Sequence, residues 1–300
     1  MSSTIGGHEV ASTLRSLLAH ATVWPRRLLL TTPDVHATVP MLRGAWGAAL
    51  HDLDPGAYTR VFDPPAPAVP GYLLLPAPPD PATAPALDWF LFGPAAGDDA
   101  VLRRAWDVAA GRGLDKERRP FLVRRFLDLG PDGRPAERPG PWPLAEATWP
   151  ADPAAPCRLS FPAPLRLLRR GRLIEQPTLA DVVVAAHRRA AAWLPPPQQA
   201  AWLALRVHLL ELARSLPSSW SGGRLDLERY SARQEAEVNL HGVSGVLELS
   251  AGVGALAPLL AAAAWLHLGK GTVFGLGQLQ VETTLSGEED PSSREDDTGP

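Results

Sequence analysis

The stretch His267-Leu268-Gly269-Lys270-Gly271-Thr272-Val273-Phe274-Gly275-Leu276-Gly277 places four glycines within nine residues. It follows an apolar helical run and precedes a strand-like segment. Glycines at this density let a backbone approach a phosphate closely and point N–H groups toward it. A loop of this kind beside a helix end and a lysine can hold an anion. The same glycines would also permit tight packing of a helix against a strand, so both interpretations stay open.

Two familiar phosphate-binding loops do not fit this stretch. The nucleotide P-loop and the dinucleotide fingerprint both run from a strand, through the glycines, into a helix. Here the order is helix, glycine loop, strand. Lys270 is one of only two lysines in the chain, the other being Lys116. A basic side chain this rare, placed among the glycines, favours contact with a phosphate backbone.

Further motifs precede the loop in a fixed order. They are Arg229-Tyr230-Ser231-Ala232-Arg233-Gln234, the Gly242 to Gly245 strand, and Pro258-Leu259-Leu260. Together with the loop, they closely resemble the C-terminal half of the CRISPR repeat-processing endoribonucleases, a family of the RAMP superfamily. Weaker matches at 164–174, 42–50, 90–93 and 111–114 extend the resemblance over roughly residues 28–285. The resemblance implies two ferredoxin-like domains that bind and cut precursor CRISPR RNA.

Hydrophobic periodicity predicts an α+β chain. An amphipathic helix is expected within residues 1–24. The predicted elements of the first half are strand 27–31, helix 40–53, strands 71–75 and 87–92, helix 98–110 and strand 121–129. In the second half, residues 131–164 are expected to form a linker and an entry strand. The elements predicted after them are hairpin 165–174, two helices covering 178–193 and 202–216, strands near 224–230 and 243–249, helix 255–267 and strand 273–282. Each half is typical of a βαββαβ unit, so two tandem ferredoxin-like domains with a C-terminal glycine-rich loop are expected.

The expected domain boundaries follow changes in composition. Residues 1–145 form the N-terminal ferredoxin-like domain, which carries the candidate catalytic histidines. Residues 146–285 form the C-terminal RAMP domain with the glycine loop. Residues 286–300 contribute −5 to a net charge of −3, so the preceding residues carry +2. That tail is predicted to be disordered. Any RNA site must then be a local basic patch within a nearly neutral body.

Composition also limits the cellular setting. No stretch approaches the ~20 uninterrupted apolar residues of a membrane span, and no signal peptide is visible. The single cysteine, Cys157, excludes an internal disulfide and a cysteine-based metal site. A cytoplasmic protein with no membrane partner is therefore expected. No motif calls for a cofactor or a metal.

The resemblance implies RNA cleavage by attack of a ribose 2′-OH, without a metal. Histidine suits the proton transfers near neutral pH. His36 lies between the first strand and first helix, where the family often has its base or acid. His51 lies near the end of that helix, and Tyr58 could support either. These two histidines are the catalytic candidates, while His267 is expected to close the loop structurally.

The RNA-binding candidates are defined by the loop and by the basic motifs. They are Arg43, Arg229, Arg233, Gly269, Lys270, Gly271, Thr272, Gly275 and Gly277. Arg229 and Arg233 either contact RNA or brace the cleft between the domains. Other arginine clusters, including Arg166 to Arg172 and Arg188 with Arg189, are either RNA contacts or ordinary surface. Most tryptophans lie on apolar stripes and are expected in the core.

Three functions remain compatible with these residues. The leading one is a metal-independent endoribonuclease that cuts precursor CRISPR RNA to give mature guide RNAs. Its partners would be CRISPR repeat RNA and, as further candidates, subunits of a CRISPR interference complex. The second is a RAMP subunit that holds guide RNA without cutting it, because this fold serves both roles. The third is a pair of ferredoxin-like domains that binds no RNA.

Overall fold

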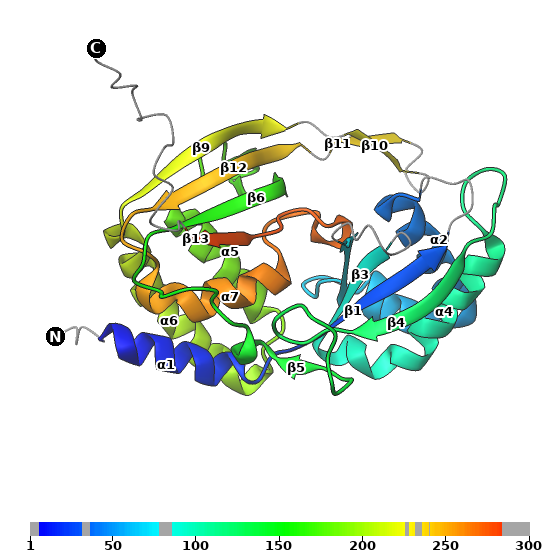
Figure 1. Cartoon of the computed structure of the whole chain (residues 1–300), viewed down its shortest axis with the longest axis horizontal. Helices are drawn as coiled ribbons and strands as arrows, with labels where there is room; N and C mark the ends of the chain where they lie inside the picture. Colours follow the sequence, from blue (N-terminus) through cyan, green and yellow to red (C-terminus); the bar gives the residue numbers. More distant parts are fainter. Residues whose placement is uncertain are drawn as a thin grey trace, which may run out of the picture.

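Two antiparallel sheets, each with helices on one face, follow one another along the chain (Figure 1). The computed structural model describes residues 6–31, 37–77, 86–225, 228–231, 236–239 and 241–283. The first unit contains, in chain order, β1 (Thr22–Thr31), α2 (Val39–Leu53), β2 (Tyr72–Pro76), β3 (Ala86–Phe92), α4 (Asp99–Arg112) and β4 (Leu122–Asp128). Its strand order, β2-β3-β1-β4, is that of a ferredoxin-like βαββαβ unit.

The second unit repeats this topology with one additional helix. It contains β6 (Cys157–Leu165), α5 (Leu179–Ala191), α6 (Pro196–Ser215), β9 (Ser218–Leu225), β12 (Gly242–Leu249), α7 (Ala257–Leu266) and β13 (Gln280–Thr283). The strand order is β13-β6-β12-β9. A short hairpin of β7 (Leu168–Arg169) and β8 (Arg172–Leu173) follows β6, and a hairpin of β10 (Glu228–Ser231) and β11 (Ala236–Asn239) lies between β9 and β12. The prediction of two tandem ferredoxin-like domains is confirmed.

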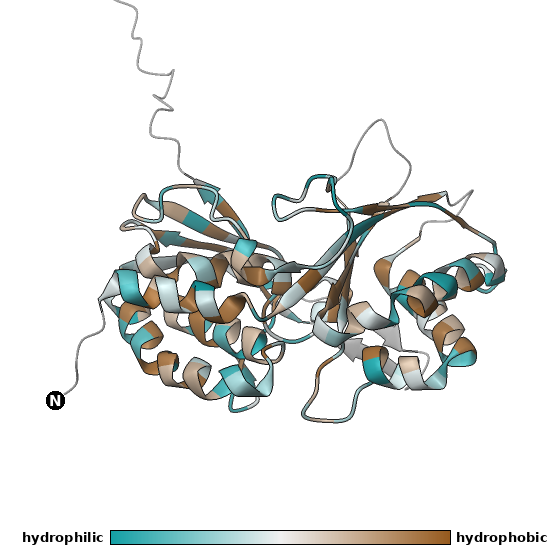
Figure 2. Ribbon diagram, turned by 90° about the horizontal axis from the view of Figure 1, so that it is seen from below, coloured by the Kyte–Doolittle hydropathy of each residue, from teal (hydrophilic) through white to brown (hydrophobic). Residues whose placement is uncertain are grey.

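Local sequence explains where the main helices begin. Thr178 accepts a hydrogen bond from the backbone of Asp181, and Asp181 accepts one in return, which forms a capping box at the start of α5. At the start of α2, the side chain of Thr38 accepts a hydrogen bond from the backbone of Met41, and Pro40 lies in the first turn. Most helices carry hydrophilic and hydrophobic residues in alternation (Figure 2), as expected for one buried face. Helix α7 is apolar nearly all round, and eight of its ten residues are buried.

One strand prediction was wrong in part. A strand was expected over residues 273–282, but Thr272–Phe274 form a short 3-10 turn and β13 begins only at Gln280. The cause lies in Gly271, Gly275 and Gly277, which all adopt positive φ, because that conformation is incompatible with an extended chain.

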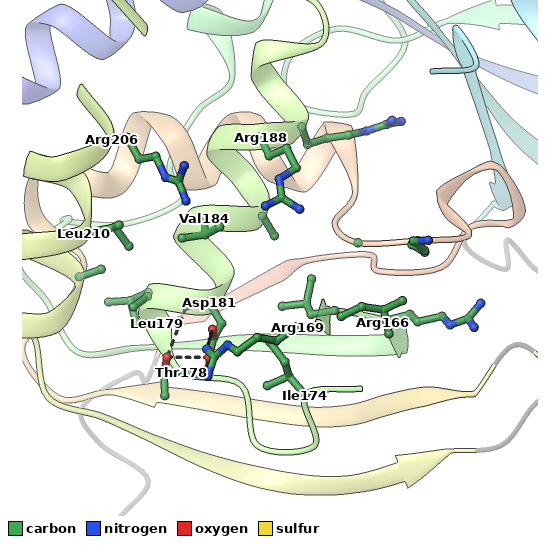
Figure 3. A pocket seen from close by; sticks show the side chains of 18 of the residues that line it. Arg166, Arg169, Ile174, Thr178, Leu179, Asp181, Val184, Arg188, Arg206 and Leu210 are labelled. Carbon is green, nitrogen blue, oxygen red and sulfur yellow. Dashed lines mark hydrogen bonds and ion pairs between the residues drawn. The ribbon is translucent and has the colours of Figure 1, made fainter. Parts of the chain in front are cut away.

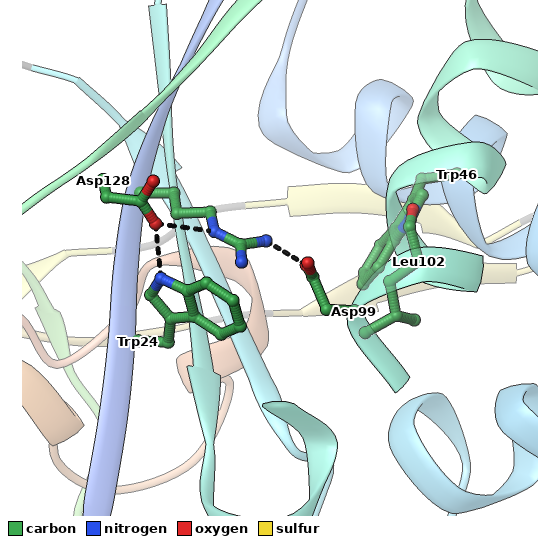
Figure 4. Close-up of polar contacts among 6 residues, drawn as sticks. Trp24, Trp46, Asp99, Leu102 and Asp128 are labelled. Carbon is green, nitrogen blue, oxygen red and sulfur yellow. Dashed lines mark hydrogen bonds and ion pairs between the residues drawn. The ribbon is translucent and has the colours of Figure 1, made fainter. Parts of the chain in front are cut away.

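A buried arginine fixes the sheet of the first unit. Arg26 on β1 is 1% exposed. Its guanidinium pairs with Asp99 at the start of α4 and, at 3.2 Å, with Asp128 on β4 (Figure 4). The same group lies 3.5 Å from the ring centre of Trp24. Because a buried charge is tolerated only when it is paired, this cluster ties β1, β4 and α4 together.

The two units share a continuous apolar interface. One face of the first sheet, with Leu73, Leu75, Phe90 and Phe92, belongs to the same hydrophobic cluster as the helices of the second unit. Helix α1 (Gly7–Leu18) also joins that cluster and contacts α6 and α7. The expected helix within residues 1–24 is therefore present, and it packs on the second unit although it precedes the first. The domain boundary at residue 145 stays a prediction, and the tail 286–300 lies outside the described residues.

No helix within the described ranges combines the length and apolar character needed to cross a membrane.

Candidate functional site

The glycine loop connects α7 to β13 and is held at both sides by backbone hydrogen bonds. The amide of Leu268 donates to the carbonyl of Gly277 at 2.9 Å, and the amide of Lys270 donates to Arg166 at 3.0 Å. A Cβ added to Gly277 would lie 1.8 Å from the carbonyl oxygen of Leu268. A Cβ on Gly269 would lie 2.4 Å from that of Arg166. These glycines are therefore required because backbone segments approach one another closely.

The loop also contacts the first unit. Gly275 has positive φ, and a Cβ there would lie 3.2 Å from atoms of Leu74 and Leu75 on β2. Next to it, Phe274 lies under the guanidinium of Arg43 from α2, at 4.7 Å from the ring centre. The structure therefore brings together Arg43 and the glycine loop, two of the predicted site elements.

Arg43 is packed within an aromatic cluster. Its Nε donates a 2.6 Å hydrogen bond to the hydroxyl of Tyr72, and its guanidinium lies 4.3 Å from the ring centre of Phe62. Arg43 is only partly exposed. Its contacts with Phe274 and Tyr72 fix the position of the loop on the first unit.

His267 occupies the end of α7 and is buried, with 1% exposure. Burial lowers its pKa to about 4, so the ring is neutral near pH 7. In the tautomer with a proton on Nδ1, the ring donates to the carbonyl of Leu276 at 3.2 Å. This contact closes the loop across nine residues, which agrees with the structural role expected from the sequence.

Lys270 lies three residues after His267 in the loop and is exposed. Beside it lies a cavity of about 1000 Å³ between α5, α6, the β7–β8 hairpin and the loop. The basic residues that line this cavity are Arg166, Arg169, Arg188, Arg189, Arg206, Arg214 and Lys270, and one carboxylate, Asp181, lies among them. The guanidinium groups of Arg188 and Arg206 extend into it from two helices (Figure 3). The loop and the arginines thus form one basic surface.

Sequence reasoning missed part of this surface. Arg206 and Arg214 belong to α6, where neither has a basic neighbour, so they form no cluster in the sequence. Their spacing of eight residues places both on one helix face, which is the signal that could have identified them.

His51 lies apart from the loop. It is eight residues beyond Arg43 on α2, which corresponds to about 12 Å along the helix. Its side chain is 61% exposed, and its Nδ1 lies 3.6 Å from Asp52. The ring meets Tyr58 edge-on with 5.1 Å between centres. Asp52 also accepts a 2.7 Å hydrogen bond from Arg112, which lowers the pKa of that carboxyl more than His51 does.

Three predicted site residues have no described side chain. His36 and Arg233 lie outside the described residues. Arg229 lies on β10, in the hairpin that extends β9 and β12 toward the side of the first unit (Figure 1). Of the remaining candidates, Thr272 is buried at 5% exposure, which limits its hydroxyl as an RNA contact. Among the described residues, no group of three or more metal-binding side chains was found.

Comparison with known proteins gives one family. Residues 159–279 match the family model described as CRISPR-associated endoribonuclease Cas6. No curated protein matches the chain. The matched segment covers most of the second unit and includes the glycine loop, in agreement with the resemblance seen in the motifs.

Solved structures share the fold over most of the chain. A Cas6 product complex is 18% identical with a TM-score of 0.55, over 87% of this chain and 100% of that one. A Cas6 of Thermus thermophilus is 17% identical with a TM-score of 0.55, over 87% and 98%. A chain of a partial Cas6-RT-Cas1–Cas2 complex is 13% identical with a TM-score of 0.55, over 90% and 47%.

Proposed function

We propose that this chain, whose residues 159–279 match the family model of the CRISPR-associated endoribonuclease Cas6, binds CRISPR repeat RNA and cleaves precursor CRISPR RNA into guide RNAs. The observation that carries the proposal is the glycine loop. It lies within the matched segment, packs against α2 and β2, and presents Lys270 beside a surface rich in arginine. Binding to other CRISPR proteins is a further part of the proposal, supported by the likeness in fold to a chain of the partial Cas6-RT-Cas1–Cas2 complex.

The proposed reaction needs no metal. The ribose 2′-OH attacks the adjacent phosphorus, the bond from phosphorus to the 5′ oxygen breaks, and the products are a 2′,3′-cyclic phosphate and a 5′-OH. A base accepts the 2′ proton and an acid gives a proton to the leaving oxygen. Cationic side chains and backbone N–H groups stabilise the additional negative charge on phosphorus.

His36 and His51 are the proposed proton-transfer groups. His36 directly precedes Ala37 and the Thr38 cap of α2, the helix whose Arg43 touches the loop. His51 is exposed at the other end of α2. We therefore favour His36, because the beginning of α2 lies nearer to Arg43 and the loop.

The proposed RNA contacts surround the loop. Lys270 supplies the charge, and Gly269 beside it is exposed, so a phosphate can approach the backbone there. Arg229 and Arg233 are also proposed to contact RNA. Gly271, Gly275, Gly277 and Arg43 would act mainly by holding the loop in place, since their contacts are with the chain itself.

The alternative is a RAMP subunit that binds guide RNA without cutting it. The observation in its favour is the distance of His51 from the loop, which leaves cleavage dependent on His36. Binding without cleavage would require only Lys270 and the arginine surface.

Cleavage of a labelled repeat RNA in EDTA tests the proposal. The protein, together with the variants His36→Ala, His51→Ala and Lys270→Ala, is compared with His20→Ala, which removes an exposed histidine after α1. We expect a cyclic phosphate product that is lost in His36→Ala while RNA binding persists. His20→Ala should cut normally. Tight binding without cleavage by the unmodified protein would instead assign the non-cleaving role.

A further inference from the structure

The cavity beside the loop has a basic face made by two helices. Arg188 on α5 and Arg206 on α6 are both exposed, and their guanidinium groups extend into the cavity (Figure 3). Four residues away on each helix lie Val184 and Leu210, which line the same cavity. Because residues at i and i+4 share a helix face, each helix presents one cation next to one aliphatic side chain.

The positive charge of the cavity is poorly balanced by the described residues. Arg169 pairs with Asp181, the one carboxylate of the lining. No ion pair joins Arg188, Arg206 or Lys270 to a carboxylate within the described part of the chain. An excess of cations around one concave surface favours an anionic ligand.

Two further arginines add positive charge to the lining of the cavity. The Nη2 of Arg189 and the Nε of Arg166 are buried without a hydrogen-bond partner. Arg189 donates through Nε to the carbonyl of Leu266, and burial lowers its pKa to about 10, so it remains charged at neutral pH. Buried donors without partners are costly, and an anion nearby reduces that cost.

The rest of the lining is aliphatic and the space is limited. Leu179, Val184, Leu210 and Ile174 form apolar walls around a volume of about 1000 Å³. Cavities of this size hold small organic ligands rather than a duplex. An arginine plane and aliphatic side chains together suit an unstacked base, and the same arginines suit its phosphate.

We infer that this cavity binds an unpaired nucleotide of the RNA substrate, with a phosphate between Arg188 and Arg206 and the base on the wall of Val184 and Leu210. The inference rests on the proposed function for the identity of the RNA. Gly269 and Lys270 belong to the glycine loop and also line the cavity. A single RNA strand that contacts the loop can therefore continue into the cavity. The cavity would therefore recognise single-stranded sequence next to the cleavage junction.

Equilibrium binding of two RNAs tests the inference. One is the repeat stem-loop alone, and the other carries its unpaired nucleotides on both sides. Both contain a 2′-deoxy nucleotide at the junction, so that binding is measured without cleavage. The protein is compared with the double variant Arg188→Gln/Arg206→Gln and with Arg104→Gln, which removes an exposed arginine of α4 outside the cavity. AMP is titrated separately as a free nucleotide.

The double variant should bind the flanked RNA about tenfold or more weakly in 0.1 M salt. The slope of log affinity against log salt should fall by about 0.7, because the contact with one single-strand phosphate is lost. Its affinity for the stem-loop alone, and the affinity of Arg104→Gln for both RNAs, should stay within twofold of the unmodified protein. Val184→Phe fills part of the cavity without changing its charge. This variant should also lower the affinity for the flanked RNA, but not the affinity for the stem-loop alone.

Equal losses on both RNAs, or a loss no larger than that of Arg104→Gln, would overturn the inference. AMP binding that the double variant abolishes, with unchanged affinity for flanked RNA, would overturn the RNA assignment in favour of a free nucleotide. Failure of the protein to cut an unmodified repeat would contradict the proposed function alone, since the binding measurement does not depend on cleavage.

Discussion

Lys270 and His267 stand three residues apart in the same loop and have opposite surroundings. Lys270 is exposed beside the basic cavity, whereas His267 is buried and neutral against the carbonyl of Leu276. A charged ammonium needs water or an anion, and a neutral imidazole can be buried when its N–H is satisfied. The two side chains therefore separate the binding role of the loop from its structural role.

Lys270→Ala should weaken RNA binding and reduce its salt dependence. Removal of one phosphate contact is expected to lower the slope of log affinity against log salt by about 0.7 to 0.9. Lys116→Ala removes the only other lysine, which is exposed in the first unit, and should leave the slope unchanged. Affinity measured at four salt concentrations checks this. Equal slopes for the two variants would contradict a phosphate contact at Lys270.

Acid should destabilise the fold through His267. The pKa of His267 falls from its usual 6.5 to about 4 on folding, so the unfolded chain binds more protons between these values. The contribution of neutral His267 to the free energy of unfolding is therefore fully present above about pH 6.5. It is lost as the pH falls toward 4, and its size is up to about 3 kcal/mol. His267→Asn keeps an N–H near the position of Nδ1 and tolerates positive φ, but does not titrate.

Urea unfolding of both proteins from pH 7.5 to 4.5 measures this contribution. The unmodified protein should have a larger free energy of unfolding than His267→Asn at pH 7.5, and this difference should shrink as the pH falls. A constant difference across the range would show that His267 does not remain neutral in the folded state.

At the level of helices and strands, the conformation of the glycine loop is fixed by backbone contacts between segments that are far apart in the sequence. Gly277 and Gly269 lie against the carbonyls of Leu268 and Arg166, so the loop joins the end of α7 to the end of β6. Arg43 and Phe274 then join the loop to α2. The geometry presented to a ligand therefore depends on three elements at once.

Gly277→Ala should disrupt the loop more than positive φ alone explains. Its added Cβ would lie 1.8 Å from a backbone oxygen that cannot move independently. Gly171→Ala is the matched control, since Gly171 also has positive φ, at 80°, but its Cβ would meet nothing within 4 Å. Gly171→Ala should lower the free energy of unfolding by about 1–2 kcal/mol. Gly277→Ala should lower it by several kcal/mol and should also abolish most RNA binding. Thermal unfolding and RNA affinity measure both. Equal costs would mean that the close approach is not essential.

Across the molecule as a whole, the two ferredoxin-like units behave as parts of one core. Phe90 of β3 meets Trp265 of α7, and Phe92 stacks on Trp193, both across the interface. Helix α1 adds a further link, because it packs on the second unit and leads directly into β1 of the first. Such an apolar interface resists independent movement of the domains.

Removal of residues 286–300 should strengthen RNA binding at low salt. The segment carries a net −5, and its loss leaves a chain of +2. Because exposed charges are screened, the gain should be several-fold at about 20 mM salt and should vanish near about 0.5 M. A tail with Glu288, Glu289 and Asp290 replaced by glutamine or asparagine serves as a control of equal length. An unchanged affinity at low salt would contradict a long-range electrostatic effect.

Local properties of the chain were enough to predict most of the helices and strands, the two ferredoxin-like repeats and the family model that residues 159–279 match. Periodicity, caps and glycine spacing carry this information, because each depends on residues close together in the sequence. The folded structure was needed to show that 273–279 is not a strand, that Arg43 is packed against the loop, and that α1 belongs to the second core. It was also needed to place Arg188 and Arg206, from separate helices, in one cavity. Such contacts depend on how distant elements pack, and local sequence does not encode that packing.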